Sequence, residues 1–214
     1  MEQKDKFDWL GAGEFYLAVG VGPHPKPWPV DDRLDPELLE NGDRRNVLDQ
    51  YRYWKLSAIV ADLETKRNSL QIAIENWQHD LNIGSIVRTA NAFNVKAVHI
   101  VGKRDWNKRG AMVTDRYLTV LHHPTVEDFK LWCLENSLPI IGIDNIDGSL
   151  PIENAALPKD CVLLFGQEGS GMSREAIAVC EKIYAIRQYG STRSMNASAA
   201  GAIAMYAWAL KHLN

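Results

Sequence analysis

The alternation of apolar and polar positions changes character near residue 71. Beyond it, short apolar runs that predict strands alternate with amphipathic stretches. In those stretches the apolar residues recur every three or four positions, which predicts helices. The expected strands cover 71–76, 97–102, 118–123, 139–144, 161–166 and 183–188, and the expected helices cover 82–93, 125–136, 173–181 and 194–212.

Strand–helix alternation of this kind is typical of an α/β fold with a mostly parallel sheet and helices on both faces. In such folds ligands bind beyond the carboxyl ends of the strands. The loops after residues 76, 144, 166 and 188 are therefore the expected places for chemistry.

Residues 1–70 are expected to form an N-terminal extension to an α/β domain over residues 71–214. Five prolines within residues 20–36 predict an extended, non-helical segment. Residues 35–67 are then expected to form one or two helices, with Asp35 as the first N-cap. A contact with RNA is a candidate role for the extension.

The composition, 46% hydrophobic and 24% charged, is ordinary for a globular protein. The three cysteines are odd in number and lack metal-ligand spacing, which favours a reducing compartment and no metal. The N-terminus carries no apolar run of signal-peptide length, and the longest near-apolar run, residues 197–210, spans only about 14 positions, too few for a membrane helix. We therefore expect a cytoplasmic protein without membrane contact.

The net charge of −3 gives no general signal for nucleic-acid binding, but the charge is unevenly distributed. Residues 1–50 hold 6 basic against 11 acidic residues, whereas residues 82–116 hold seven basic against two acidic. The window KRDWNKRG interleaves basic side chains with Trp106, a combination suited to phosphates and an unstacked base. A solvated basic loop without a partner is the alternative. The residues expected to bind RNA are Lys103, Arg104, Lys108, Arg109 and Arg116.

The stretch NIGSIVRTANAF, residues 82–93, predicts a helix with a single cation opposite its apolar stripe. The helical neighbours of Arg88 include Gly84 and Ser85, which are small enough for another molecule to come close. This pattern indicates an approach surface around Arg88. A solvated surface arginine is the alternative interpretation.

Two further loops have compositions that suit ligand binding. In FGQEGSGMS, three glycines allow a ligand to approach the backbone, and Glu168 is a carboxylate between glycines with no visible packing role. The spacing matches neither the dinucleotide fingerprint nor the phosphate-binding loop of nucleotide hydrolases. In QYGSTRSMNASAAG, small and polar residues crowd the start of the last helix, where free N–H groups attract anions. Simple helix capping by Ser194 or Asn196 is the alternative.

These three segments, in this order, resemble the motifs of the SpoU-type (TrmH-like) RNA ribose 2′-O-methyltransferases of the SPOUT superfamily. NIGSIVRTANAF is similar to the first motif, VLLFGQEGSGMS to the second and IRQYGSTRSMNASAAGAIAMY to the third. The resemblance covers about residues 71–212.

The resemblance implies a deep trefoil knot at the C-terminal end of the sheet, S-adenosylmethionine as cofactor, and a homodimer with its sites at the interface. It implies an RNA substrate, and an extension followed by a minimal knot domain favours tRNA over rRNA. The implied cofactor contacts are Ile143, Gly166, Ile186 and Met195. The implied catalytic residues are Asn82, Arg88, Glu168, Ser194 and Asn196.

In this family the arginine that corresponds to Arg88 is the proposed base, but an arginine stays protonated in water. We therefore expect Arg88 to pair with the target phosphate and to stabilise charge at the nucleophile. The alternatives for the whole protein are the same reaction on ribosomal RNA, and an RNA-binding protein that keeps the fold without turnover. A dinucleotide-dependent dehydrogenase is disfavoured, because no G-x-G-x-x-G follows the first strand.

Overall fold

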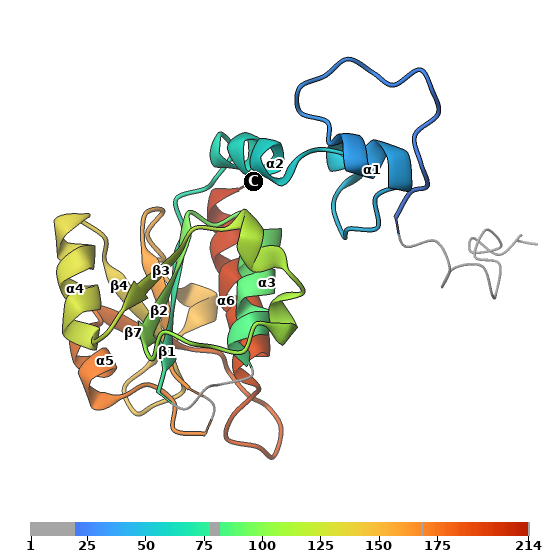
Figure 1. The fold of residues 1–214 in the computed structure, drawn as a ribbon. Helices are drawn as coiled ribbons and strands as arrows, with labels where there is room; N and C mark the ends of the chain where they lie inside the picture. Colours follow the sequence, from blue (N-terminus) through green and yellow to red (C-terminus); the bar gives the residue numbers. More distant parts are fainter. Residues whose placement is uncertain (1–19, 78–81, 168, 214) are drawn as a thin grey trace, which may run out of the picture. The chain divides into compact units, whose positions relative to one another are not determined.

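The computed structural model describes residues 20–77, 82–167 and 169–213 of the chain. The chain divides into two compact units between Asp62 and Leu63, and Figure 1 shows their elements. Among the described residues, no helix is both long and apolar enough to cross a membrane.

A seven-stranded sheet organises the second unit, and every neighbouring pair of its strands is parallel. The strands are β1 (Gln71–Asn76), β2 (Ala97–Gly102), β3 (Val120–His123), β4 (Ile140–Ile143), β5 (Leu150–Pro151), β6 (Val162–Phe165) and β7 (Lys182–Ala185). Their order across the sheet is β3-β2-β1-β6-β4-β7-β5. The prediction of a mostly parallel α/β sheet is thereby confirmed.

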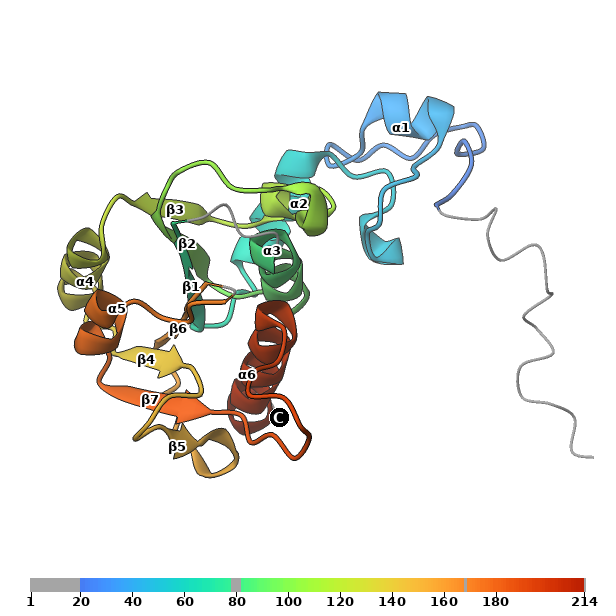
Figure 2. The same ribbon diagram turned by 90° about the horizontal axis from the view of Figure 1, so that it is seen from below.

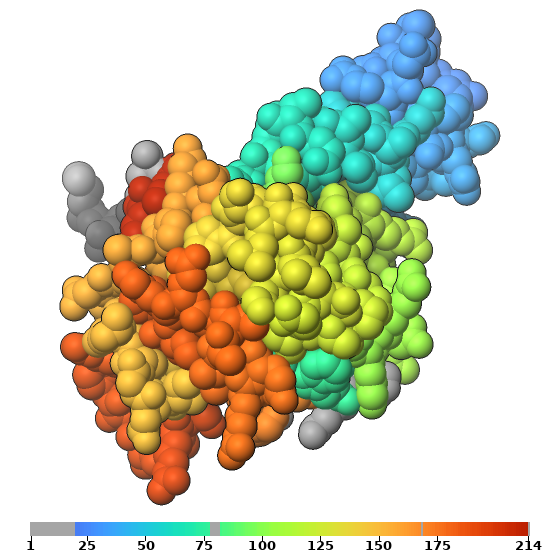
Figure 3. Space-filling view, turned by 90° about the vertical axis from the view of Figure 1, so that its left-hand side faces the viewer, coloured from blue at the N-terminus to red at the C-terminus, as the bar shows by residue number. Residues whose placement is uncertain are grey.

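Helices cover both faces of this sheet (Figures 1 and 2). On one face lie α3 (Asn82–Ala92) and α6 (Ala197–His212), and on the other lie α4 (Val126–Glu135) and α5 (Arg174–Val179). Figure 3 shows α4 and α5 side by side on the second face. Alternate strand residues enter separate cores, so Ile72 packs on the side of Trp208 in α6, whereas Ala73 packs on the side of Phe129 in α4.

The main differences from the sequence expectation lie at element ends. The strand expected at 118–123 begins at Val120, because the 3-10 helix η3 (Thr114–Tyr117) ends shortly before it with Leu118 as its C-cap. The last helix was expected from residue 194 but begins at Ala197, since the side chain of Asn196 caps it by accepting from the N–H groups of Ser198 and Ala199. The two-residue strand β5 was not predicted, because two positions show no periodicity.

In the first unit, Asp35 caps α1 (Pro36–Asn41) as predicted, and its side chain accepts from the N–H of Glu37. The 3-10 helix η1 (Asp49–Tyr51) and α2 (Leu56–Glu64) follow, and the last two residues of α2 belong to the second unit. The buried carboxylate of Asp43 accepts hydrogen bonds from Arg45 and from the N–H of Tyr53. Burial alone would raise the pKa of Asp43, but these hydrogen bonds outweigh it and lower that pKa to about 2.

Candidate active site

The loops that follow β4, β6 and β7 line a cavity of about 450 Å³, which lies within the usual range for ligand pockets. All four residues expected to contact the cofactor line it: Ile143 ends β4, Gly166 follows β6, Ile186 follows β7 and Met195 precedes α6. Ser194 and Asn196 line the same cavity. The cavity therefore lies at the carboxyl ends of the strands, where the sequence indicated chemistry.

The glycine-rich loop after β6 folds tightly on itself. Gln167 and Gly171 exchange two backbone hydrogen bonds of 3.1 Å, and Gly171 adopts a positive φ of 68°. A Cβ atom on Gly166 would lie 2.1 Å from the backbone nitrogen of Met172. No side chain fits at position 166, which leaves the backbone bare on the cavity wall.

Asp144 and Asn145 join the three loops to one another. One carboxylate oxygen of Asp144 accepts from the backbone N–H of Met172 at 2.8 Å, and the other accepts from the N–H of Asn145 at 2.7 Å. The side chain of Asn145 donates to the carbonyl of Arg193 at 3.0 Å. No motif in the sequence marks Asp144 or Asn145, although a carboxylate directly after a buried strand is an available signal.

The end of β1 is also tied to the glycine-rich loop. Glu75 is fully buried, and its two oxygens accept from the indole nitrogen of Trp77 and from the backbone N–H of Ser173, both at 2.8 Å. The side-chain oxygen of Gln167 accepts from the backbone N–H of Trp77 at 3.0 Å. These bonds fix the loop relative to the strand whose end leads toward α3.

Two of the expected catalytic residues contact each other directly. The side-chain nitrogen of Asn196 donates to the side-chain oxygen of Asn82 at 2.8 Å, between the first residue of α3 and the N-cap of α6. Asn82 is buried, with 7% of its surface exposed. Glu168, which is also expected to be catalytic, lies outside the described residues.

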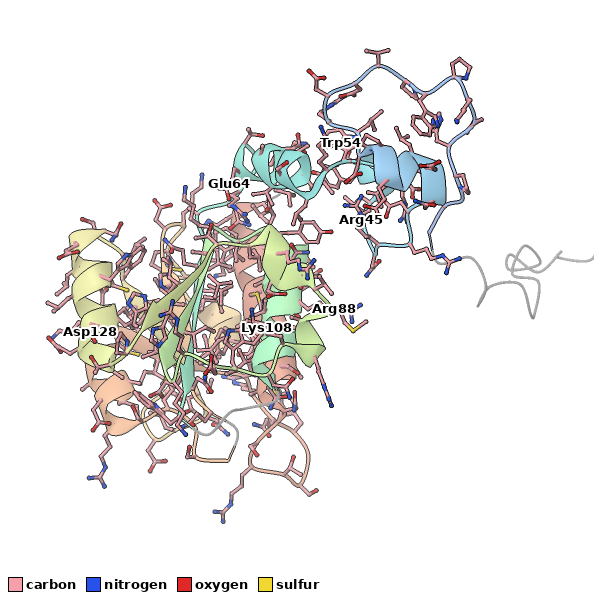
Figure 4. The ribbon with its side chains drawn as sticks, viewed as in Figure 1. Arg45, Trp54, Glu64, Arg88, Lys108 and Asp128 are labelled. Carbon is pink, nitrogen blue, oxygen red and sulfur yellow. The ribbon has the colours of Figure 1, made fainter. Side chains whose placement is uncertain are left out.

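Arg88 does not line the cavity of its own chain. Its side chain is exposed, and Figure 4 shows it on the side of α3 that faces away from the sheet. Within the described residues, no hydrogen bond or ion pair occupies its guanidinium group. A single chain therefore joins Asn82 to Asn196 and places Ser194 on the same cavity as Asn196, but Arg88 does not line that cavity.

The expectation of an open approach surface beside Arg88 is wrong at Gly84. Gly84 is buried, and a Cβ atom there would lie 2.8 Å from the backbone nitrogen of Ala111 and 2.9 Å from the carbonyl oxygen of Asn107. Gly110 approaches Ser85 in the same way. The small residues of α3 thus allow segment 107–111 of the same chain to pack closely against this helix. The segment contains the 3-10 helix η2 (Arg109–Ala111).

This docked segment belongs to the basic loop, so the loop lies against the helix that carries Arg88. The ammonium of Lys108 pairs with Asp115 at 3.2 Å and lies 5.5 Å from the ring centre of Trp106. Figure 4 shows Lys108 beside α3. The five residues expected to bind RNA are all exposed, namely Lys103, Arg104, Lys108, Arg109 and Arg116.

The model of the SpoU rRNA Methylase family matches residues 69–206, which contain the three predicted motifs, the cavity and the basic loop. The chain belongs to this family. The predicted family and the predicted enzyme class, an RNA methyltransferase, are therefore confirmed.

Similar proteins carry related names. The tRNA (guanosine(18)-2'-O)-methyltransferase of Escherichia coli K12 is 25% identical over 158 residues, which cover 72% of this chain and 68% of that protein. The putative TrmH family tRNA/rRNA methyltransferase YacO of Bacillus subtilis is 25% identical over 191 residues, which cover 79% of this chain and 72% of that protein.

Solved structures share the fold. The TrmH/SpoU tRNA modifying enzyme of A. aeolicus aligns with a TM-score of 0.63 at 23% identity, over 72% of this chain and 80% of that one. The SpoU methyltransferase AviRb of Streptomyces viridochromogenes, solved with AdoMet, aligns with a TM-score of 0.62 at 21% identity, over 70% of this chain and 60% of that one.

Proposed function

We propose that this SpoU-family protein transfers a methyl group from S-adenosylmethionine to a ribose 2′-hydroxyl of tRNA. The observation that carries the proposal is the convergence of the second and third motif segments on one cavity, with the first joined to them through Asn82 and Asn196. The name of the Escherichia coli relative supports tRNA as the substrate.

The cavity fits the cofactor in size and chemistry. Ile143, Ile186 and Met195 offer apolar surface, and the bare backbone at Gly166 offers hydrogen-bonding groups. No lysine or arginine is among the described lining residues, so the cavity suits a ligand without phosphates. S-adenosylmethionine, when bound, supplies a methyl group on a positively charged sulfur.

The predicted trefoil knot is part of this proposal. It is supported by the neighbouring positions of β6, β4 and β7 in the sheet. The segment between β7 and α6 meets the loops after both other strands at the same cavity. A chain that passes through these loops would create a bent, enclosed binding site from backbone groups.

The predicted homodimer would explain why Arg88 lies apart from its own cavity. On α6, the apolar side chains of Ile203, Tyr206 and Leu210 are 41%, 56% and 51% exposed and share one helical face. This helix packs against α3, which carries Arg88. A second copy that covers this face would complete the site with Arg88 of the partner subunit.

In the completed site, Arg88 holds the phosphate of the target nucleotide and stabilises the negative charge that develops on the 2′-oxygen. Asn82, Ser194 and Asn196 position the ribose, and Glu168 has the same proposed role. Correct positioning alone can contribute several kcal/mol to such a reaction.

The basic loop would bind the RNA phosphates next to Arg88, because its segment 107–111 docks on α3. This proposal covers Lys103, Arg104, Lys108, Arg109 and Arg116 together. An RNA contact by the N-terminal unit and a cytoplasmic location stay predictions.

Mass spectrometric mapping of 2′-O-methyl nucleosides in total tRNA and rRNA, with and without this gene, tests the proposal. We expect one 2′-O-methyl nucleoside to disappear from tRNA. Loss from rRNA alone would support the alternative substrate. No loss from either RNA, together with no binding of S-adenosylmethionine in calorimetry, would support an RNA-binding protein without turnover.

A further inference from the structure

We propose that Asp144 is the residue with which the cavity distinguishes a positively charged ligand from its neutral counterpart. The inference rests on the proposed function, because it concerns the methyl donor and the product that remains after transfer. Of the described residues that line the cavity, Asp144 alone is charged.

The carboxylate of Asp144 is held in place by the backbone alone. Its two oxygens accept from the N–H groups of Met172 and Asn145 at 2.8 and 2.7 Å. Within the described part of the chain, no ion pair joins it to a basic side chain. Each oxygen retains a further lone pair, so a fixed and unneutralised negative charge lies at the cavity wall.

Such a charge favours a cationic ligand, because the attraction between unit charges is strong at short range inside a protein. Methyl transfer breaks the bond between methyl carbon and sulfur, and both bonding electrons stay on the sulfur. The sulfonium therefore becomes a neutral thioether, S-adenosylhomocysteine. We infer that Asp144 strengthens binding of the methyl donor more than binding of this product, which favours exchange after each turnover.

Asp144 also has a structural role, since it fixes the glycine-rich loop. A purely structural role would affect both ligands equally, because they share every group except the charged sulfur and its methyl group. The ratio of the affinity for the donor to the affinity for the product therefore distinguishes an effect of the charge from an effect of the loop structure. Because each variant is measured with both ligands, the ratio is insensitive to a fraction of unfolded protein.

The experiment measures the binding of S-adenosylmethionine and S-adenosylhomocysteine by calorimetry in the wild type, Asp144→Asn and Gly169→Ala. Asn has nearly the same shape as Asp but no charge. For Asp144→Asn, we expect the Kd for the donor to rise at least about tenfold and the Kd for the product to rise less than about threefold.

Gly169→Ala is the matched control. Gly169 has a φ of +89°, and a Cβ atom placed there would meet no atom within 4 Å outside its chain neighbours, so the substitution strains the loop without touching the carboxylate of Asp144. We expect this variant to weaken both ligands by similar factors.

Equal weakening of both ligands by Asp144→Asn, or no change for either, would overturn this inference and leave the proposed function standing. A wild-type protein that binds neither ligand would overturn both. The inference is supported if the ratio of donor affinity to product affinity is unchanged in Gly169→Ala and reduced in Asp144→Asn.

Discussion

Asn196 donates a hydrogen bond from its side-chain nitrogen to the side-chain oxygen of Asn82 at 2.8 Å, although the two residues lie 114 positions apart. With its own oxygen, Asn196 caps α6 by accepting from the N–H groups of Ser198 and Ala199. One amide thus closes the N-terminus of α6 and fixes the start of α3. Two of the three motif segments are coupled through this contact.

Substitutions at position 196 separate the cap from the contact with Asn82. Asn196→Ala removes both, and we expect a loss of about 1–2 kcal/mol in the free energy of unfolding. Asn196→Ser keeps a capping oxygen but does not reach Asn82, so it should lose about half as much. Urea unfolding of the full chain measures both values. Equal losses in the two variants would mean that the contact with Asn82 adds no stability.

Gly166→Ala should strongly weaken cofactor binding. The new Cβ atom would lie 2.1 Å from the backbone nitrogen of Met172, so the glycine-rich loop must move away from β6. We expect the Kd for S-adenosylmethionine to rise at least about a hundredfold, which calorimetry measures.

Gly190→Ala is the control for this substitution. Gly190 lies in the loop before α6, and no atom lies within 4 Å of a Cβ placed there. Its Kd should match the wild type. An unchanged Kd in Gly166→Ala would show that the cofactor does not contact this part of the cavity wall.

A buried histidine pair should make stability depend on pH. His99 contacts His123 at 2.9 Å and Gln71 at 2.8 Å. Burial, followed by the proximity of His123, lowers the pKa of His99 from 6.5 to about 3, and burial also lowers the pKa of His123. His99 is therefore neutral in the folded state at pH values well above 3, whereas the same side chain in the unfolded chain takes up a proton below pH 6.5.

Stability should therefore decrease as the pH falls from 6.5 toward 4.5, by up to about 1.4 kcal/mol per pH unit from His99, and the lowered pKa of His123 adds a decrease in the same direction. Asp43 titrates at lower pH, so it does not contribute in this window. Urea unfolding at pH 7.5, 6.0 and 5.0 checks the prediction, and His99→Gln should show a shallower decrease. An identical slope in this variant would exclude His99 as the source.

Arg109→Ala should weaken tRNA binding without changing the Kd for S-adenosylmethionine, because Arg109 is exposed on the basic loop and does not line the cavity. Each lost phosphate contact should also lower the slope of log affinity against log salt by about 0.7–0.9. Arg174→Ala, an exposed position on α5 at the opposite face of the sheet, is the control. Equal effects of the two variants would mean that the basic loop has no special role.

Periodicity was sufficient to predict the main strands and helices, because buried strands and amphipathic helices leave local patterns. It could not predict contacts between distant segments. Glu75 resembles any polar residue in a strand, yet it accepts from the N–H of Ser173, 98 positions away. The local pattern indicates free space beside Gly84, because the segment 107–111 that covers this glycine is distant in sequence. The carboxylate of Asp144 accepts from the N–H of Met172, 28 positions away, and no local pattern predicts that contact.

Methyl transfer by Arg88→Ala tests the central claim most directly. The purified wild type and variant are incubated with tRNA and S-adenosylmethionine that carries a deuterated methyl group, and the 2′-O-methyl nucleosides are quantified by mass spectrometry. Calorimetry with S-adenosylmethionine is run on the same samples. The account predicts that the variant transfers methyl groups at least about a hundredfold more slowly and binds the cofactor as the wild type does. Wild-type turnover by Arg88→Ala would contradict it.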